Sequence, residues 1–351
     1  MDSQPEQPSA LRAAADNSAP AQPSGCAPEM RAQGHDPRCP GACGSASAEE
    51  PEAQQAPSPG PTPLLSTGSL FHLPLPHIAR IAREAGFAGL DLVMGSTKIA
   101  PGAALDEAHA LCPVWTVHAP FRNWSAWGGH MDAWRAAVTL AAGLRCQANR
   151  NAVHVTLHPP AGTLRDAIQT RWFARAVDLP RLLGAPAGVD LSLENLPWAG
   201  AAGGFFGRDN LASLLDQCRE KDLGLTLDVC HLGVSGRDVL ADLERIPCDA
   251  DACLIRHVHF SDAAGYTEHL PPGTGELPLG PFLASLGLRG YAGGVSLELD
   301  PAQLPEDEAG QVRVLRSLRR SMRRALAGDP PAAWAGQPRA RNNQQVQAAF
   351  G

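Results

Sequence analysis

The sequence predicts an α/β protein built on a single (β/α)8 TIM barrel. Short apolar runs alternate with amphipathic segments through the central region, which is typical of a parallel sheet whose strands are joined by helices. Acidic and imidazole side chains stand at the ends of successive runs, and a barrel of this kind brings residues from many strands together at one end. The stretch from residue 63 to residue 327 also has about the length of one such barrel.

Both ends of the chain are expected to lie outside this domain. Residues 1–62 are rich in Ala, Pro, Gln, Ser and Gly and poor in β-branched and aromatic side chains, so they cannot bury enough apolar surface to offset the entropy of ordering. Residues 328–351, with DPP, GQP and NNQQ clusters, have the same character. We therefore expect a disordered extension at 1–62, the barrel at 63–327 and a disordered tail at 328–351.

Eight strands are expected because eight apolar runs are bounded by turn residues. In chain order they cover residues 64–68, 89–93, 114–119, 152–158, 189–194, 225–228, 255–261 and 294–299.

Intervening segments place apolar residues at helical spacing, and some of them end at a glycine suited to a C-cap. These segments are PHIARIAREAG (76–86), AWRAAVTLAAGLR (133–145), LRDAIQTRWFARAVDLPRLLG (164–184) and NLASLLDQCREK (210–221). A terminal helix carries the arginine cluster at 313–324, which is typical of a solvated face. An open doubly wound sheet is the alternative fold, but no Gly-rich phosphate loop such as GxGxxG follows the first strand.

Charge and cysteine usage restrict the partners and the compartment. The formal net charge is -7, and the middle of the chain has no basic stripe, so a nucleic-acid partner is not expected. Nine cysteines without paired short spacing in the domain argue against a disulfide framework and favour a reducing compartment. No apolar run near the N-terminus is long enough for a signal sequence or a membrane span. We expect a soluble cytoplasmic protein, and the sequence leaves a homo-oligomer open.

The predicted strand ends carry a series of potential metal ligands. They are His118 in HAP, His158 in LHP, Glu194 in LEN, Asp228 and His231 in LDVCH, His259 in HVHFSD and Glu298 in VSLELDP. Nitrogen and oxygen donors that converge at one end of a barrel suit a metal ion. The sequence therefore predicts a metalloenzyme.

The order of these motifs resembles the xylose isomerase-like TIM barrel superfamily over about residues 64–300. The motifs are HAPF (118–121), LHPPAG (157–162), LENLP (193–197), LDVCHLG (227–233), HVHFSD (257–262), HLPPGTGEL (269–277) and LEL (297–299). That superfamily includes sugar and sugar-phosphate isomerases and epimerases, and also the endonuclease IV type of apurinic endonuclease, AP endonuclease family 2. The series is specific for the superfamily and poorly specific for the reaction.

The resemblance implies a four-ligand metal site and a role in carbohydrate metabolism. Glu194, Asp228, His259 and Glu298 would hold one divalent ion (Mn, Mg, Co or Zn), with His231 facing the substrate. Such an ion acidifies the C–H between a hydroxyl and a carbonyl and stabilises the enediolate. Glu194 and Glu298 would exchange the proton on the two faces of that carbon. We therefore expect an isomerase or epimerase acting on a sugar or sugar phosphate.

The same resemblance supports a zinc-dependent phosphoester hydrolase as the alternative. In the endonuclease branch, histidines matching His118, His158, His231 and His269 bind additional zinc ions, and all four are present. The branch has an acidic residue where this chain has Thr267, with Glu268 shifted by one position. A threonine hydroxyl is a poor zinc ligand, so a site with three zinc ions is not expected. A site with two zinc ions is kept as an alternative. The substrate would be a small phosphodiester or abasic DNA.

A non-catalytic barrel is the third alternative, and the loss of a core ligand would support it; the sequence shows no such loss.

Further roles are expected for residues near the strand ends. Trp124 and Trp198 are predicted to contact substrate, because they follow the third and fifth strands on the face where barrel active sites lie. We expect Asp91 to be structural at the barrel mouth, and His257 to be packed on the opposite face of its strand from His259. Asp262 is expected either to orient a ligating histidine or to cap the following loop.

Overall fold

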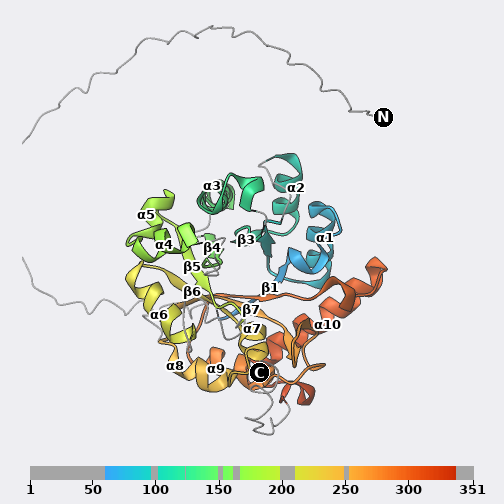
Figure 1. Cartoon of the computed structure of the whole chain (residues 1–351). Coiled ribbons are helices and arrows are strands. Elements are labelled where there is room, and N and C mark those ends of the chain that lie inside the picture. The colour runs from blue at the N-terminus through green and yellow to red at the C-terminus, as the bar shows by residue number, and fades with distance from the viewer. Residues whose placement is uncertain are drawn as a thin grey trace, which may run out of the picture. The chain divides into compact units, whose positions relative to one another are not determined.

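The computed structural model describes residues 60–95, 102–122, 124–148, 153–160, 167–197, 210–248 and 253–336. Within these ranges, eight parallel strands close into a barrel in the order β1, β10, β7, β6, β5, β4, β3, β2. Figure 1 shows helices arranged around these strands. The predicted (β/α)8 barrel is confirmed.

The barrel strands match the eight predicted runs closely, and β5 matches at both ends. They are β1 (Thr62–Ser66), β2 (Leu90–Val93), β3 (Val114–His118), β4 (Val153–Leu157), β5 (Val189–Glu194), β6 (Gly224–Asp228), β7 (Ile255–Phe260) and β10 (Gly294–Leu297). Their residues are almost all buried, as expected when helices cover the outside of a parallel sheet and side chains fill the inside.

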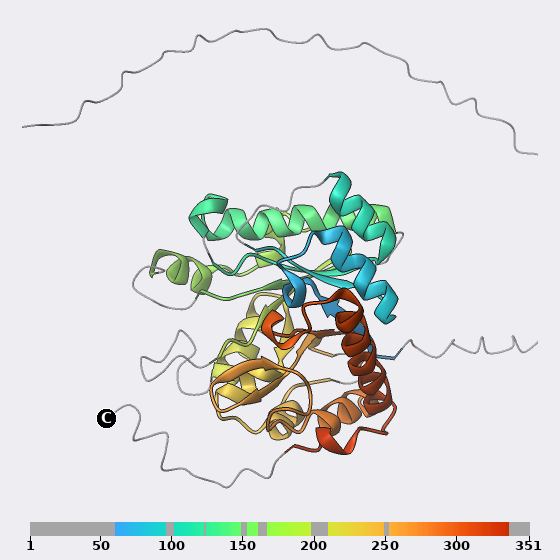
Figure 2. The same ribbon diagram turned by 90° about the vertical axis from the view of Figure 1, so that its right-hand side faces the viewer.

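The helices follow the strands in the expected alternation. They are α1 (Leu75–Ala85), α2 (Ala103–Leu111), α3 (His130–Ala148), α4 (Ala167–Arg175), α5 (Leu179–Leu183), α6 (Asn210–Glu220), α7 (Val229–Val234), α8 (Val239–Arg245), α9 (Leu279–Leu288) and α10 (Glu308–Leu326). α10, which carries the arginine cluster, lies alongside α1 (Figure 2). Their N-terminal turns are joined where Glu308 contacts His77 at 2.8 Å and Arg80 at 3.2 Å.

Local sequence explains where two of these helices begin and end. α1 ends at Gly86, which has a φ of 86° and donates its N–H to the carbonyls of Ala82 and Arg83. This left-handed C-cap favours glycine because glycine has no Cβ. The segment 164–184 divides into α4 and α5, because the Asp178 side chain caps the N-terminus of α5 by accepting the N–H of Arg181 at 3.0 Å.

A two-stranded antiparallel hairpin, β8 (Asp262–Ala264) and β9 (Thr267–Leu270), follows β7. The Asp262 carboxylate organises it and the loop beyond it, accepting the N–H groups of Gly273 at 2.8 Å, Gly275 at 3.0 Å and Leu277 at 3.0 Å. Of the two roles expected for Asp262, these contacts support loop capping.

The C-terminal boundary of the packed domain lies beyond the predicted one. We expected a loose tail from residue 328, but residues 328–336 are described, and Trp334 in the 3-10 helix Ala332–Trp334 is only 4% exposed. Its ring lies 5.7 Å from the ring of Phe260, and it covers Gly273. Pro330 and Gly336 also lie against Gly280 and Pro278, so the segment packs on the barrel at several points. At the other end, β1 begins at Thr62, and residues 1–59 and 337–351 lie outside the described ranges.

One disulfide is present among the described residues, between Cys248 and Cys253. The analysis of cysteine spacing looked for a framework of repeated pairs, and a single local bridge has no such pattern. Cys112, Cys218 and Cys230 are buried free thiols.

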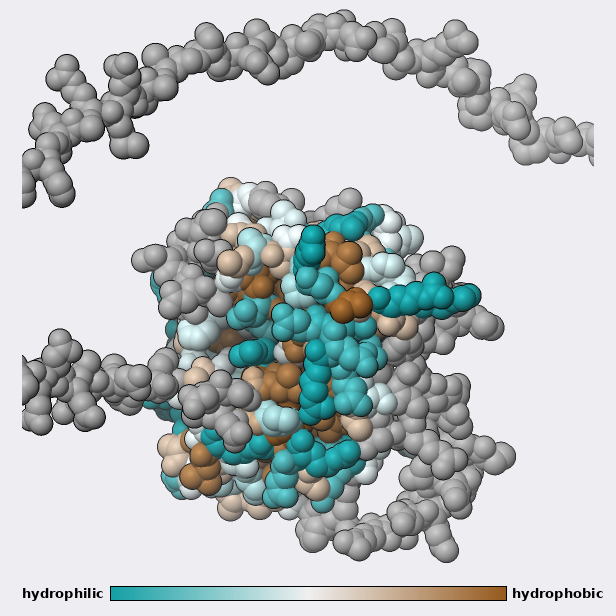
Figure 3. Space-filling view, turned by 90° about the vertical axis from the view of Figure 1, so that its left-hand side faces the viewer, coloured by the Kyte–Doolittle hydropathy of each residue, from teal (hydrophilic) through white to brown (hydrophobic). Residues whose placement is uncertain are grey.

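Of the helices in the described ranges, none combines the length and the hydrophobicity needed to cross a membrane. On the face shown in Figure 3, hydrophobic side chains form small patches separated by hydrophilic ones. Patches of this kind are ordinary for a protein surface in water.

Replacing Trp334 with alanine should destabilise the barrel, because it removes a buried aromatic side chain that packs on Phe260. We expect a loss of about 3 kcal/mol in the free energy of unfolding, measured by urea denaturation. Phe71→Ala is the matched control, since Phe71 is 73% exposed, and it should change stability by less than about 0.5 kcal/mol. Equal stabilities for the two variants would show that residues 328–336 do not contribute to the core.

Candidate metal centre

The carboxyl ends of the barrel strands bring the predicted ligands together. His118, Glu194 and Asp228 are the last residues of β3, β5 and β6, and His259 lies near the end of β7 in register with Asp228. His158 and Glu298 follow β4 and β10 directly. Donors from six strands therefore converge, as the sequence predicted.

Glu194 lies at the centre of this group. Its Oε2 is 3.0 Å from His118 Nε2 and 2.8 Å from His158 Nε2. Its Oε1 is 3.1 Å from His259 Nδ1 and 3.4 Å from His231 Nδ1. The side chain is 1% exposed. The two oxygens of one buried carboxylate thus face two different pairs of imidazoles.

Three adjoining sets of donors have the spacing of metal ligands. In each set, one ligand atom per residue lies within 4.8 Å of the others, and the sets are His118, His158 and Glu194; Glu194, Asp228 and His231; and Asp228, His259 and Glu298. Metal–ligand bonds of about 2.0–2.2 Å place the donors of one ion roughly 3–4 Å apart, so the distances fit. Asp228 Oδ2 is buried without a hydrogen-bond partner among the described residues, and such an oxygen is costly unless a cation compensates it. The residues therefore fit divalent metal ions.

Backbone carbonyls fix the orientation of two histidines. His118 Nδ1 lies 2.8 Å from the carbonyl oxygen of Ala119, and His231 Nδ1 lies 2.9 Å from that of Asn195. A carbonyl only accepts, so each Nδ1 carries the proton and each Nε2 is left with a lone pair. For His118, this lone pair points to the Glu194 side, where a metal ion would bind.

Asn195 is a structural residue of the centre to which sequence reasoning assigned no role. Its side chain donates to the carbonyl of Asp228 at 2.9 Å and accepts the N–H of Asp228 at 2.8 Å. Asp228 Oδ1 in turn caps α7 by accepting the N–H of His231 at 2.8 Å. The asparagine of LENLP therefore joins the ends of β5 and β6 and sets the position of both the carboxylate and the following histidine.

The electrostatics of the centre depend on contacts between buried groups of opposite charge. Burial by itself raises the pKa of a carboxyl, but His259, His158 and His118 outweigh it and hold the pKa of Glu194 well below its ordinary value. Burial lowers the pKa of an imidazole, yet the carboxylates of Glu194 and Glu298 raise the pKa of His259 well above its usual range. Burial raises the pKa of Asp228. The imidazoles around Glu194 therefore stabilise its carboxylate form.

A fourth set of donors lies beside Thr267. Thr267 is exposed, but His231, Glu268 and His269 bring ligand atoms within 4.8 Å of one another. His269 has a φ of 56°, a left-handed conformation that is rare outside glycine. Its backbone is held there by bonds from its N–H to Cys230 Sγ and from the Asp300 N–H to its carbonyl. The shifted acidic residue, Glu268, thus lies with the two histidines after all.

The aromatic residues near the centre differ from those predicted. Trp124 is half-buried and stacks on His130 with 4.1 Å between ring centroids, so part of its surface is used in packing. Trp198 lies outside the described residues, and contact of either tryptophan with substrate stays a prediction. Sequence reasoning missed Phe121, whose ring lies 5.4 Å from His118 and 5.2 Å from His158. Its position three residues after His118 in HAPF was the available signal.

The expectation for His257 was wrong, and that for Asp91 was incomplete. His257 and His259 are two residues apart on β7, and residues at that spacing share a face of a strand. Both are fully buried inside the barrel, and both face Asp91 on β2. Asp91 is itself fully buried rather than part of an open mouth.

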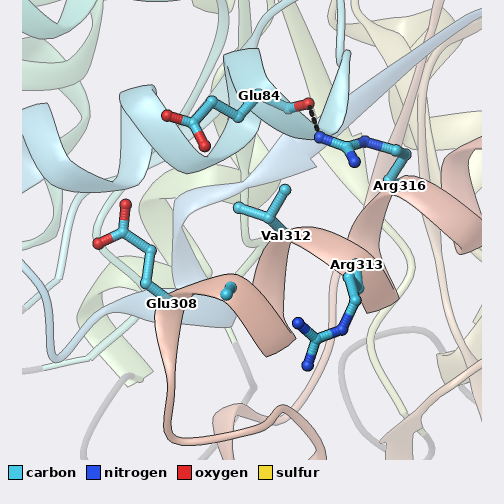
Figure 4. Close-up of a pocket in the computed structure, with 6 residues that line it drawn as sticks. Glu84, Glu308, Val312, Arg313 and Arg316 are labelled. Carbon is cyan, nitrogen blue, oxygen red and sulfur yellow. Dashed lines mark hydrogen bonds between the residues drawn. The ribbon is translucent and has the colours of Figure 1, made fainter.

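A surface pocket of ≈ 410 Å³ lies apart from these ligands, between α1 and α10 (Figure 4). Arg316 reaches across it to the backbone carbonyl of Glu84 at 2.8 Å. The pocket shares no residue with the sets of metal ligands. Its lining is Glu84, Glu308, Ala309, Val312, Arg313 and Arg316.

A family model described as "Xylose isomerase-like TIM barrel" matches residues 79–321 of the sequence. The chain belongs to the xylose isomerase-like TIM barrel family. The resemblance inferred from the motifs is therefore confirmed. No match is found among curated proteins.

Solved structures of xylose isomerase-like barrels share this fold at low sequence identity. A xylose isomerase domain protein from Alicyclobacillus acidocaldarius is 19% identical with a TM-score of 0.54, covering 76% of this chain and 98% of its own. A D-tagatose 3-epimerase-like protein is 19% identical with a TM-score of 0.52, covering 75% and 98%. An AP endonuclease, family 2, from Brucella melitensis is 19% identical with a TM-score of 0.51, covering 72% and 96%. These likenesses show the fold and leave the reaction to be inferred from the site.

Replacing Asn195 with alanine should weaken metal binding as well as stability. The change leaves the N–H and the carbonyl of Asp228 without their side-chain partner, which should cost about 2 kcal/mol in unfolding experiments. Because Asp228 shifts with its backbone, we expect the affinity for Mn²⁺ or Zn²⁺ to fall about tenfold in calorimetric titration.

Gln311→Ala is the matched control for the asparagine variant. Gln311 is a buried amide on α10 that donates to the carbonyl of Pro305 at 3.0 Å, away from the metal ligands. It should lower stability without changing metal affinity. If the two variants bind metal equally well, Asn195 does not position the ligands.

Proposed function

We propose that this chain is a metal-dependent hydrolase of small phosphoesters, with two divalent ions that share Glu194. The observation that carries the proposal is the split contact of the Glu194 carboxylate. One oxygen faces Nε2 of His118 and of His158, and the other faces Nδ1 of His259. His231 Nδ1, 3.4 Å from the same oxygen, donates to the Asn195 carbonyl and is not counted as a ligand. A carboxylate that presents its two oxygens to two sets of ligands is the arrangement of a bridging ligand between two ions.

The same contacts make Glu194 a poor acid–base catalyst for an isomerase. The proton-transfer mechanism expected from the sequence needs Glu194 to take a proton from a substrate carbon. Its side chain is 1% exposed and both of its oxygens face imidazoles, which leaves neither oxygen open to a substrate carbon. We therefore rank hydrolysis above isomerisation, the reverse of the order that the sequence favoured.

Hydrolysis assigns distinct tasks to the residues of the centre. When bound, two such ions supply Lewis-acid charge to phosphoryl oxygens and lower the pKa of a water molecule. His118 and His158 would hold one ion, and Asp228, His259 and Glu298 the other. In the reaction, water adds to phosphorus, the ester P–O bond breaks, and the leaving alcohol takes up a proton. Glu298, with 19% of its side chain exposed, is the most accessible of the three central carboxylates and is placed to accept the proton of the attacking water.

A small anionic phosphoester suits this chain better than DNA. The formal net charge of -7 disfavours a phosphate backbone, which usually requires a basic track to replace its counterions. The arginine cluster lies on α10, beside α1, and belongs to a different part of the surface from the metal ligands. We keep nucleic acid as a disfavoured partner.

A metal-dependent isomerase or epimerase of a sugar or sugar phosphate is the second candidate. The observation that favours it is the convergence of Glu194, Asp228, His259 and Glu298, the four ligands that the family resemblance implies for one ion. The third reading, a barrel without catalytic activity, gains no support from the site because each of these four residues lies within it.

Metal content distinguishes the first two candidates. Protein purified without chelator should contain at least two ions per chain by elemental mass spectrometry. The double variant His118→Ala, His158→Ala should lose one of them, because these two imidazoles face only one oxygen of Glu194. His109→Ala removes a buried histidine from α2, outside the centre, and should leave the count unchanged. One ion per chain in all three proteins would contradict the bridged centre.

Catalytic activity should depend on the same two histidines, His118 and His158. We expect the wild type to hydrolyse bis(p-nitrophenyl) phosphate and the double histidine variant to lose at least about 100-fold in kcat/KM. Interconversion of ketohexoses, followed by chromatography, tests the second candidate in parallel. Epimerisation that survives in the double variant, without phosphoester hydrolysis in the wild type, would overturn our ranking.

Replacing Glu298 with glutamine should abolish most activity while leaving the fold intact. The change removes the carboxylate that would take the proton of the attacking water, and we expect a fall of about 100-fold or more in kcat. Glu276→Gln is the matched control, since Glu276 is an exposed carboxylate on the nearby loop. If Glu298→Gln kept full activity, the assigned site would be wrong.

A further inference from the structure

A second polar cluster lies on the interior side of the metal centre, and no step of the proposed reaction uses it. It consists of Asp91 on β2 and of His257 and His259 on β7, all at most 1% exposed. Asp91 Oδ2 lies 3.3 Å from His259 Nε2 and 3.5 Å from His257 Nε2. Neither Asp91 Oδ2 nor either of these nitrogens has a well-aligned hydrogen-bond partner among the described residues. The carboxylate oxygen of Asp91 and the two imidazole nitrogens therefore have one another as polar neighbours.

His259 presents its two ring nitrogens to different surroundings. Nδ1 faces the metal ligands, at 3.1 Å from Glu194, 3.4 Å from Glu298 and 3.8 Å from Asp228. Nε2 faces the barrel interior. A neutral imidazole that offers the Nδ1 lone pair to a metal ion must carry its proton on Nε2. That proton then lies beside Asp91 Oδ2, which is 3.3 Å from Nε2.

Asp91 is held in place to accept it. The Thr116 hydroxyl donates to Asp91 Oδ1 at 2.6 Å, which fixes the carboxylate plane and leaves Oδ2 turned toward the two imidazoles. Asp91 and Thr116 are paired across β2 and β3, so the backbone register supports this contact. The anchor lies on strands that contribute no ligand to the set of Asp228, His259 and Glu298, so it is held by backbone pairing rather than by those ligands.

A buried carboxylate in this place also has an electrostatic effect. An uncompensated charge is costly in a protein interior, and the imidazoles of His259 and His257 are the polar groups that lie beside the Asp91 carboxylate, at 3.3 and 3.5 Å from Oδ2. The anion in turn increases the electron density of the His259 ring and makes Nδ1 a stronger metal ligand.

We propose that Asp91 is a positioning residue that acts through His259, fixing its tautomer and ring orientation so that Nδ1 binds a metal ion. The inference rests on the metal centre of the proposed function, but not on the reaction that the centre performs. It changes the role expected from the sequence, in which Asp91 was a structural residue of the barrel mouth.

The test is metal affinity in Asp91→Asn, which keeps the volume of the side chain and removes its charge. We expect affinity for Mn²⁺ or Zn²⁺ to fall about 10–100-fold in calorimetric titration of the full-length protein. The visible absorption spectrum of the Co²⁺-loaded protein should shift, because it reports how His259 is oriented toward the ion. A purely structural role would lower stability without altering that spectrum.

Two controls separate this role from general damage. Asp242→Asn removes a buried carboxylate on α8 that is paired with Arg237 and Arg245, and it should reduce stability without changing metal affinity. In a His259→Gln background the imidazole is already absent, so Asp91→Asn should cause no further loss of affinity. A loss of the same size in both backgrounds would overturn the proposal.

A milder variant covers the case in which Asp91→Asn fails to fold. Thr116→Val keeps the Asp91 charge but removes the hydroxyl that orients it, so affinity should fall several-fold and the Co²⁺ spectrum should shift in the same direction. Unchanged affinity and spectrum in the folded variants would refute the role of Asp91. If the wild type itself bound no metal, the proposed centre would fail instead, and the two failures are distinguishable.

Discussion

The buried negative charge of Glu194 is the constraint on which the carboxyl end of this barrel depends. A carboxylate that is 1% exposed needs partners, since its burial without them would be strongly unfavourable. The partners come from β3, β7 and the segments that follow β4 and β6, so the positions of several strand ends are tied to one side chain. The histidines in turn are oriented by backbone carbonyls and by Asp91. The ligand geometry is therefore a property of the whole barrel end rather than of any one loop.

The barrel interior below the ligands is polar as well, which is unusual beside the branched apolar layers common in this fold. Ser192 and Thr226 are bonded at 2.5 Å, Thr156 and Thr226 at 2.9 Å, and His154 and Ser192 at 2.7 Å. Short side chains that bond to one another satisfy their polar atoms without water. These residues fill the barrel interior next to the histidines of the candidate metal centre. The apolar core lies mainly between the strands and the helices.

Sequence reasoning found the elements whose signals are local and missed those that depend on distant contacts. The eight strands and most ligands followed from apolar runs and from the residues at their ends. The β8–β9 hairpin did not, because the Asp262 carboxylate that holds it accepts N–H groups from residues up to fifteen positions away. The contribution of Glu268 depends on the left-handed backbone of His269, which no spacing rule indicates. The packing of Trp334 beyond the predicted boundary depends on a contact with Phe260. The face assigned to His257 was an error of periodicity, since residues two apart on a strand point the same way.

Charge links the number of metal ions to the class of substrate. Glu194, Asp228 and Glu298 contribute three negative charges when ionised, and neutral histidines contribute none. One divalent ion leaves the centre with a net negative charge, which tolerates a neutral sugar and repels a phosphoester anion. Counted over these three ligands alone, two ions leave a net positive charge, which attracts such an anion and stabilises the charge that develops on its oxygens. Asp91, behind His259, adds one further negative charge that is farther from the substrate side. Because Glu194 offers its two oxygens to separate sets of residues, the proposed centre corresponds to the second state. On that proposal the substrate class follows from the geometry around one carboxylate, and a barrel without His118 and His158 would suit a neutral substrate.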